Sequence, residues 1–367
     1  MIAGIRPARL PDFPWDTLAA EAAIAAAHPD GIVDLSVGTP VDPVPDVVRA
    51  ALCGPAADEP GYPTTHGTPE LRAALCGALR RRFGVVVDPA AVLPTIGSKE
   101  LVAWLPTLLG LGPDHTVVGP ELAYPTYEVG ARLAGAHWVR ADSLTTLGPR
   151  RVALVWVNSP SNPTGRVLLA AHLRKVVAWA RERGVVVASD ECYLSLAGGT
   201  DAISVLHPDV CDGSHEGLLA VHSFSKSSNL AGYRAGFITG DPALVAGLLD
   251  VRKHAGMIMP RPVQAAMAAA AADDAHVAAQ AQVYARRRTV LRPALESAGL
   301  VVEHSEAGLY LWASEGRPSR LTVRDLAAQG VLVAPGEFYG PAGARHVRVA
   351  LTATDERIAA AADRLAP

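Results

Sequence analysis

The chain has 367 residues, half of them hydrophobic, and its formal net charge is −3. This length and apolar content exclude a disordered chain and predict a large core divided between two domains. The balanced charge argues against a nucleic-acid partner, which would require a basic stripe. We expect no membrane span, because the longest uncharged run, Val152–Gly165, is shorter than the roughly 20 apolar residues of a spanning helix. Residues 1–15 contain no apolar block, so we expect no signal peptide.

Lysine is rare in this chain, so chemistry that needs a primary amine has few candidates. Only four of the 33 basic residues are lysines: Lys99, Lys175, Lys226 and Lys253. The cysteines lie far apart, at positions 53, 76, 192 and 211. This spacing argues against a zinc ribbon or a disulfide scaffold, and we expect reduced thiols in the cytoplasm and no metal site.

Helical and strand-like segments alternate over the first two thirds of the chain. Helices are predicted at Pro69–Phe83, with Thr68 as N-cap, at Leu101–Leu111 and at Leu168–Arg183. Nearly continuous apolar runs, typical of strands buried on both faces of a parallel sheet, occur at Thr116–Gly119, Val152–Val157, Val185–Ser189, Leu218–Ser223 and Ala235–Thr239. This alternation predicts an open α/β sheet between two layers of helices.

The pattern changes after about Asp241. Helices are predicted at Pro242–His254, Pro262–Ala272 and His276–Ala298, followed by strands at Gly308–Ala313, Val331–Ala334 and His346–Ala350 and a terminal helix from Thr354. This order predicts a smaller α+β domain that both ends of the chain reach. We therefore divide the chain into an N-terminal arm with part of the small domain (1–45), a large domain (46–255), and an interdomain helix with the rest of the small domain (256–367).

Polar side chains follow three of the predicted strands. Asn162 lies in the turn after the first of these strands, Asp190 and Tyr193 follow the second, and Ser223 and Lys226 follow the third. Because ligands of open α/β sheets bind at the carboxyl ends of the strands, we expect these side chains to share one site.

This set of groups suits one kind of chemistry. Burial lowers the pKa of a lysine, and only the neutral amine attacks a carbonyl. A carboxylate such as Asp190 can hold the protonated ring nitrogen of pyridoxal phosphate. The hydroxyls of Ser223 and Ser225 with an arginine, and the Gly97-Ser98 turn before a helix, suit a phosphate.

Each residue alone also has a plain structural interpretation. The Asn162–Gly165 segment is a good turn sequence, Asp190 suits an N-cap, Tyr193 suits the core, and Arg234 suits the surface. Their joint order after consecutive strands is what favours a shared site.

Three motifs carry a resemblance to a known family. Ser223–Gly236 resembles the lysine signature of the class I/II pyridoxal-phosphate aminotransferases, and Asn162–Gly165 and Asp190–Tyr193 are similar to that family's other two markers. The resemblance runs from about Asp34 to the C-terminus. It implies the fold type I architecture: a mostly parallel seven-stranded sheet between helices, plus a smaller α+β domain. It also implies pyridoxal 5′-phosphate as cofactor, amino and 2-oxo acids as substrates, and a homodimer with shared active sites.

The resemblance assigns most of these residues to the cofactor. Lys226 would form the covalent link and move the substrate proton, Asp190 would pair with the ring nitrogen, and Asn162 and Tyr193 would contact the phenolic oxygen. The phosphate would be held by Ser98, Lys99, Ser223 and Arg234. Tyr124 would stack on the ring, and Tyr62 would reach the phosphate of the partner subunit's cofactor.

The substrate α-carboxylate would bind at Gly38, Asn162 and Arg348. Arg345 competes with Arg348 for this role, and we favour Arg348 because it falls within the predicted strand. A planar guanidinium suits a carboxylate better than an ammonium does.

The segments Leu10–Asp16, Val37–Pro43 and Arg252–Met257 are similar to actinobacterial N-succinyldiaminopimelate aminotransferases of diaminopimelate and lysine biosynthesis. That substrate carries several carboxylates, and the candidates to bind the distal ones are Arg6, Lys253 and Arg261. Two alternatives share the same residues: an aminotransferase for an aromatic, alanine-type or aspartate-type substrate, and a carbon–sulfur β-lyase. We set aside a hydride-transferring Rossmann enzyme, because the chain lacks the glycine-rich fingerprint, and a DNA-binding regulator, because fewer than about 40 residues precede the first motif.

Overall fold

The computed structural model describes residues 10–148 and 150–366, and its largest element is a seven-stranded sheet in the order β2-β8-β7-β6-β5-β3-β4. The strands are β2 (Val92–Ile96), β3 (Thr116–Gly119), β4 (His137–Arg140), β5 (Val152–Asn158), β6 (Val186–Asp190), β7 (Leu218–Ser223) and β8 (Ala235–Gly240). The predicted α/β class with a mostly parallel sheet is therefore confirmed, since β4, β3, β5, β6 and β7 pair in parallel.

One strand runs against the prediction. β8 was expected in the parallel set, yet it pairs antiparallel with both β7 and β2. The physical reason is the short connection between Ser223 and Ala235, which contains no helix. A parallel neighbour needs a crossover of a dozen or more residues, usually helical, whereas an antiparallel neighbour does not.

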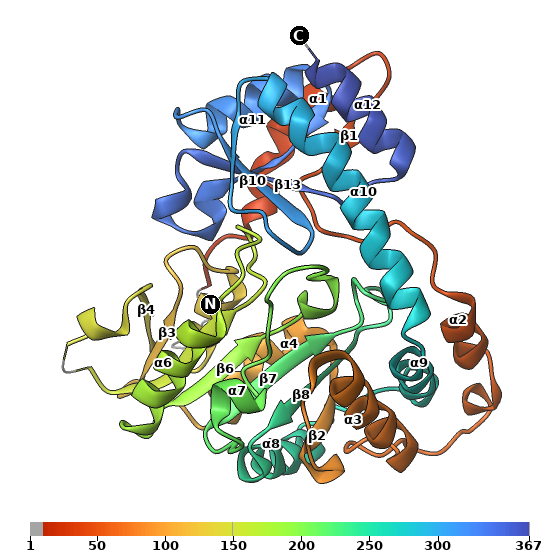
Figure 1. Cartoon of the computed structure of the whole chain (residues 1–367), viewed down its shortest axis with the longest axis vertical. Helices are drawn as coiled ribbons and strands as arrows, with labels where there is room; N and C mark the ends of the chain where they lie inside the picture. The colour runs from red at the N-terminus through yellow and green to blue at the C-terminus, as the bar shows by residue number, and fades with distance from the viewer. Residues whose placement is uncertain (1–9, 149, 367) are drawn as a thin grey trace, which may run out of the picture.

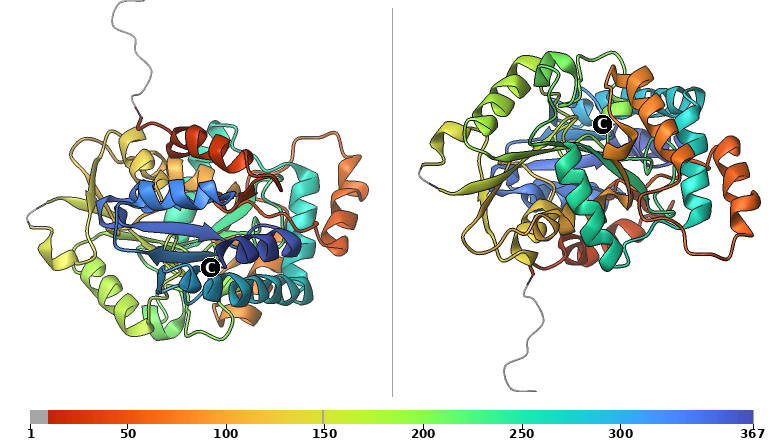
Figure 2. Two further views of the ribbon diagram at one scale, coloured as in Figure 1. Left: turned by 90° about the horizontal axis from the view of Figure 1, so that it is seen from above. Right: turned by 90° about the horizontal axis from the view of Figure 1, so that it is seen from below.

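Helices cover both faces of this sheet (Figures 1 and 2). One face packs on α3 (Pro69–Phe83), α6 (Ala170–Arg181) and α9 (Arg261–Ala272), and the other on α4 (Gly97–Leu108), α5 (Thr126–Leu133) and α8 (Pro242–His254). The shorter helices are α2 (Asp46–Leu52) and α7 (Pro208–Cys211). Thr68 caps α3 as predicted, accepting a hydrogen bond from the Leu71 N–H. Every helix in the described part of the chain is too short or too polar to span a bilayer.

The C-terminal part of the chain builds a second core around a smaller sheet. Its strands are β9 (Val301–Glu303), β10 (Tyr310–Ser314), β12 (Ala334–Pro335) and β13 (His346–Ala350), and its helices are α10 (Ala275–Ser297), α11 (Ser319–Ala328) and α12 (Asp355–Leu365). The N-terminal elements α1 (Ala19–Ala26) and β1 (Val33–Asp34) join this core, because β1 pairs with β11 (Val331–Leu332). The boundaries at residues 45 and 255 remain a prediction.

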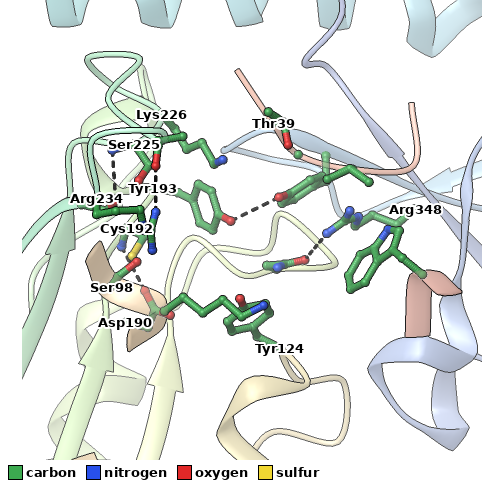
Figure 3. Close-up of a pocket in the computed structure, with 18 of the residues that line it drawn as sticks. Thr39, Ser98, Tyr124, Asp190, Cys192, Tyr193, Ser225, Lys226, Arg234 and Arg348 are labelled. Carbon is green, nitrogen blue, oxygen red and sulfur yellow. Dashed lines mark hydrogen bonds between the residues drawn. The ribbon is translucent and has the colours of Figure 1, made fainter. Parts of the chain in front are cut away.

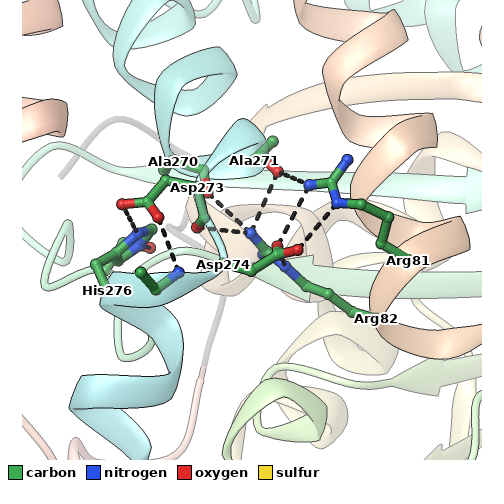
Figure 4. Close-up of polar contacts among 9 residues, drawn as sticks. Arg81, Arg82, Ala270, Ala271, Asp273, Asp274 and His276 are labelled. Atoms are coloured by element: carbon green, nitrogen blue, oxygen red, sulfur yellow. Dashed lines mark hydrogen bonds and ion pairs between the residues drawn. The ribbon is translucent and has the colours of Figure 1, made fainter.

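Helix α10 runs from the large sheet to the small one (Figure 1), and the turn before it is held by a polar cluster (Figure 4). Arg81 and Arg82 both pair with Asp274, at 2.9 and 2.6 Å. Both guanidinium groups also donate to the Ala271 carbonyl at the end of α9. These contacts satisfy the carbonyl groups that a helix C-terminus leaves free, and they fix the start of α10 against α3.

Candidate active site

A cavity of about 340 Å³ lies at the carboxyl ends of β5, β6 and β7, facing the small domain (Figure 3). All the predicted site residues except Tyr62 line it: Gly38, Ser98, Lys99, Tyr124, Asn162, Asp190, Tyr193, Ser223, Lys226, Arg234 and Arg348. Its size is that of a small-molecule site. The strand ends therefore bring together the groups that the sequence places far apart.

Lys226 lies in the loop between the antiparallel strands β7 and β8. Burial, together with the nearby guanidinium groups of Arg348 and Arg234, lowers the pKa of its amine to about 8. Because the charged form is disfavoured, a larger fraction of this amine is neutral near neutral pH than in a solvated lysine. Lys175, by contrast, is exposed on α6.

The Lys226 loop is anchored to helix α10. The Ser228 hydroxyl, which is fully buried, lies 2.8 Å from His276 Nε2. His276 Nδ1 in turn lies 3.2 Å from Asp273 Oδ2 (Figure 4). Burial lowers the pKa of His276. This arrangement resembles a serine–histidine–aspartate triad in its contacts, but no substrate can reach a hydroxyl that is fully buried. We therefore read it as an anchor for the loop.

Asp190 ends β6 with its carboxylate almost completely buried. Burial raises its pKa, whereas hydrogen bonds from the Cys192 N–H at 3.2 Å and the Tyr127 hydroxyl at 2.8 Å favour its charged form. A cationic partner in the cavity would stabilise the charged form of this buried carboxylate further. Tyr127 was not predicted as a site residue, although it lies three residues after Tyr124.

Arg348 comes from β13 of the small domain and is only 2% exposed. It donates to Asn162 Oδ1 at 2.9 Å and to the Ser36 carbonyl at 2.7 Å. Its Nε has no hydrogen-bond partner among residues 10–148 and 150–366. The guanidinium therefore joins the two domains and keeps donor capacity for an anion.

The other end of the cavity is a narrow cradle at the start of α4. Gly97 has a positive φ of 73°, and a Cβ built there would overlap the Arg234 guanidinium. A Cβ on Gly236 would lie 3.0 Å from the Ser98 nitrogen. Glycine is thus required on both sides of this cradle. The first N–H groups of α4 and Arg234 make it suitable for an anion.

Lys99 differs from its neighbours in orientation. Its Nζ lies 5.2 Å from the centre of the Phe13 ring, so its side chain extends toward the N-terminal segment. Burial lowers its pKa, and the charge of Arg234 lowers it too. Because Lys99 is exposed and also lines the cavity, it is a cation where the cavity opens to solvent.

Tyr62 does not line the cavity and is 96% exposed. Its segment is held by Arg261, which pairs with Glu59 at 2.7 Å and donates to the Tyr62 carbonyl at 3.4 Å.

The remaining candidate cations lie outside the cavity. Lys253 pairs with Asp250 at 3.3 Å on α8, and Arg261 makes the contacts just given. Arg345 is exposed and does not line the cavity, unlike Arg348. Arg6 lies outside the described residues.

The lining residues that were not predicted as site residues include three aromatic side chains and a thiol: Phe13, Trp15, Tyr310 and Cys192. Two signals were present in the sequence, since the aromatic pair lies in the Leu10–Asp16 segment and Cys192 lies inside the Asp190–Tyr193 motif. Tyr310 had no local signal, because its position depends on how the small domain packs.

Comparison with known proteins agrees with this geometry. The family model described as "Aminotransferase class I and II" matches residues 30–365. A probable aminotransferase of Mycobacterium tuberculosis is 64% identical, over 99% of this chain and 88% of the relative. The 4-dedimethylamino-4-oxo-anhydrotetracycline transaminase of Streptomyces rimosus is 61% identical, over 97% and 99%. Among solved structures, a probable N-succinyldiaminopimelate aminotransferase from Thermus thermophilus is similar with a TM-score of 0.87, 29% identity, and coverage of 96% and 99%. The chain therefore belongs to the class I and II aminotransferases, enzymes that bind pyridoxal 5′-phosphate.

Proposed function

We propose that this enzyme transfers an amino group from glutamate to N-succinyl-2-amino-6-oxopimelate, giving N-succinyl-LL-diaminopimelate and 2-oxoglutarate for lysine biosynthesis. The observation that carries this proposal is a cavity with two cations suited to substrate carboxylates. Arg348 lies deep beside Asn162, and Lys99 lies at the mouth. A substrate with carboxylates at both ends uses both cations. The similarity to the Thermus thermophilus enzyme supports the same substrate.

The cavity fits the phosphorylated cofactor of the family. The glycine-lined cradle around Ser98 and Arg234 leaves room for a phosphate and offers it N–H donors. Asp190, buried and without a cationic partner in the described residues, suits a protonated ring nitrogen. When bound, pyridoxal phosphate supplies an electron sink that stabilises negative charge at the substrate Cα.

The side chains of this chain then perform the remaining tasks. Lys226 would hold the cofactor, and its free Nζ would take the substrate Cα proton and later return it. Tyr124 would stack on the cofactor ring, and Asn162 and Tyr193 would donate hydrogen bonds to its phenolic oxygen. A neutral amine is required for the proton step, and the lowered pKa of Lys226 provides it.

Arg348 orients the substrate. Its position on β13 places a planar cation beside Asn162, and the backbone of Gly38 lines the same part of the cavity. Bidentate binding of the α-carboxylate there fixes the Cα–H bond relative to Lys226. Glutamate and the succinylated substrate share this α-carboxylate, so one site serves both half-reactions.

We also propose that the enzyme acts in the cytoplasm as a homodimer. Tyr62 supports this assembly, because a tyrosine that is 96% exposed becomes useful when a second subunit covers it. In the dimer, its hydroxyl would contact the phosphate held by the partner subunit.

A half-reaction screen tests this function. The purified enzyme, loaded with pyridoxal phosphate, is mixed with single amino acids while its cofactor absorbance is recorded. Glutamate and N-succinyl-LL-diaminopimelate should both change the spectrum. Lys226→Ala should abolish both the borohydride-trapped link and turnover. No response to the succinylated compound would reject the substrate.

Lys99 provides a sharper test of the distal carboxylates. Lys99→Met should weaken binding of N-succinyl-LL-diaminopimelate more than binding of alanine, which lacks a distal carboxylate. Lys175→Met, on the exposed face of α6, is the matched control and should change neither.

A second function is favoured by the 61% identity to the tetracycline-pathway transaminase, which acts on a fused-ring ketone by its name. The aromatic side chains of Phe13 and Trp15 at the cavity suit such a ring. The same screen separates the two functions, because conversion of a fused-ring amine without response to the succinylated amino acid would favour this second one. Pyruvate release from cystathionine without a keto acid would instead indicate a β-lyase.

A further inference from the structure

We propose that Tyr310 is a positioning residue that fixes the substrate-carboxylate site relative to the cofactor site. It would do so by contacting Arg348 with its ring and Tyr193 with its hydroxyl. This inference rests on the roles proposed above for those two residues. Tyr310 lines the cavity and is 3% exposed.

The ring of Tyr310 supports the arginine. In the antiparallel pair β10–β13, Trp312 lies opposite Arg348 and Tyr310 opposite Ala350, so Tyr310 and Arg348 are diagonal neighbours on one face. The guanidinium carbon lies 4.0 Å from the Tyr310 ring centre, compared with 5.0 Å for Tyr339 and 5.8 Å for Trp15. Of these rings, Tyr310 is therefore the main cation–π partner of a buried charge, where such contacts are strongest.

The hydroxyl of Tyr310 contacts Tyr193, on the cofactor side of the cavity. It lies 3.2 Å from the Tyr193 hydroxyl (Figure 3). Within the described residues, Tyr193 Oη has no other hydrogen-bond partner. Burial raises the pKa of Tyr193. Either hydroxyl can donate in the bond between them, so Tyr310 donates whenever the Tyr193 proton is given to another acceptor. Tyr193 thus stays a neutral phenol whose proton is available to an acceptor in the cavity.

The backbone at Gly38 packs closely against the Tyr310 hydroxyl. A Cβ built on Gly38 would overlap the Tyr310 hydroxyl and would lie 2.9 Å from the ring carbon that bears it. The φ of Gly38 is not in the left-handed region, so space rather than backbone conformation requires glycine here. The phenol is thereby clamped between the backbone, Tyr193 and Arg348.

These contacts make a defined prediction about Tyr193. A hydroxyl that donates to Tyr193 Oη polarises it and makes it a better donor to the phenolic oxygen of the cofactor. A stronger donor favours the deprotonated form of the bound cofactor, and loss of the Tyr310 hydroxyl therefore raises the pH midpoint of the cofactor's absorbance change. The ring, which remains in phenylalanine, continues to support Arg348.

Two variants of the loaded enzyme separate these effects. Tyr310→Phe should raise the pH midpoint by about half a unit to one unit. It should leave the dissociation constant for maleate, an unreactive dicarboxylate, within about twofold. Tyr310→Leu should raise the midpoint similarly and weaken maleate binding by about 5- to 30-fold, because the ring contact is lost. Tyr284→Phe, a buried tyrosine outside the cavity, is the control and should change neither quantity.

The outcomes distinguish this inference from the proposed function. If wild-type enzyme takes up pyridoxal phosphate and Lys226 is trapped by borohydride, yet Tyr310→Phe leaves the midpoint unchanged, the positioning role is overturned and the function stands. A purely structural role would lower the thermal unfolding temperature of both variants without moving the midpoint, which also overturns it. If the wild-type enzyme fails to take up the cofactor, the proposed function and this inference both fail.

Discussion

Replacement of Arg348 by lysine tests which arginine binds the substrate carboxylate. Arg348 and Arg345 lie three residues apart, but the first is buried in the cavity and the second is exposed. Lysine keeps the positive charge and much of the length, so the change removes mainly the planar fork of donors. Any effect then reports on geometry rather than on charge alone.

The size of the effect follows from the contacts of Arg348. Its two hydrogen bonds, to Asn162 Oδ1 at 2.9 Å and to the Ser36 carbonyl at 2.7 Å, leave the fork oriented for a third partner. Hydrogen bonds from charged groups contribute roughly 1.5–3 kcal/mol each, and an ammonium can satisfy one protein acceptor and one carboxylate oxygen but not the full set. We therefore expect a loss of about 2–4 kcal/mol of transition-state stabilisation, or about 30- to 1000-fold in kcat/KM for glutamate.

The assay is the glutamate half-reaction of the loaded enzyme, followed by absorbance in a stopped-flow instrument. Arg345→Lys is the matched control and should stay within about twofold of wild type. The rate with an amine that lacks a carboxylate should be affected by neither change. A kcat/KM for Arg348→Lys within about threefold of wild type, or a larger loss in Arg345→Lys, would refute the assignment.

Three further predictions concern stability and packing. In the unloaded protein, Lys226→Met should raise the free energy of unfolding at pH 7 by up to about 3 kcal/mol, because it removes an amine whose folded pKa of about 8 lies below its unfolded value of 10.5. Wild-type stability should rise between pH 8 and 10.5 as this amine loses its charge, and the advantage of the variant should vanish by pH 10.5. Denaturant unfolding over this pH range measures the difference. Gly38→Ala should cost about 1–3 kcal/mol through its overlap with Tyr310, and a double-mutant cycle with Tyr310→Phe should show a smaller cost; equal costs in both backgrounds would contradict the contact. Ser228→Ala should lower stability by about 1–3 kcal/mol because His276 Nε2 loses a buried partner, and an unchanged thermal unfolding curve would contradict the anchor.

The sequence predicts the interior of the large sheet better than its edges. Thr116–Gly119 was predicted with the bounds of β3, and the runs for β5, β6 and β7 differ from the structure by one residue at most at either end. Within this sheet, the two strands without a prediction are β2 and β4, which form its edges. β2 contains Pro94, which an edge strand tolerates, and β4 is partly exposed, so neither forms a continuous apolar run.

The sequence likewise predicts one part of the candidate site and misses another. The residues at the ends of β5, β6 and β7 were found because the carboxyl ends of parallel strands meet at one edge, which is a property of any such sheet. Tyr310 and Trp15 approach from the small domain and the N-terminal segment, and long-range packing alone places them there. No periodicity within the chain encodes that approach.

The antiparallel direction of β8 explains why the phosphate-binding candidates meet at all. Ser223 at the end of β7 pairs with Gly236 near the start of β8, and Ala235 pairs with Ile96 at the end of β2. Arg234 precedes Ala235 directly and Ser98 follows Ile96 by two residues, so both lie at the same edge as Ser223. In the parallel arrangement first expected, the start of β8 would lie at the opposite edge, roughly 20 Å away for a six-residue strand. The motif Ser223–Gly236 thus forms one site only as a hairpin, and the short loop that carries Lys226 is what imposes that hairpin.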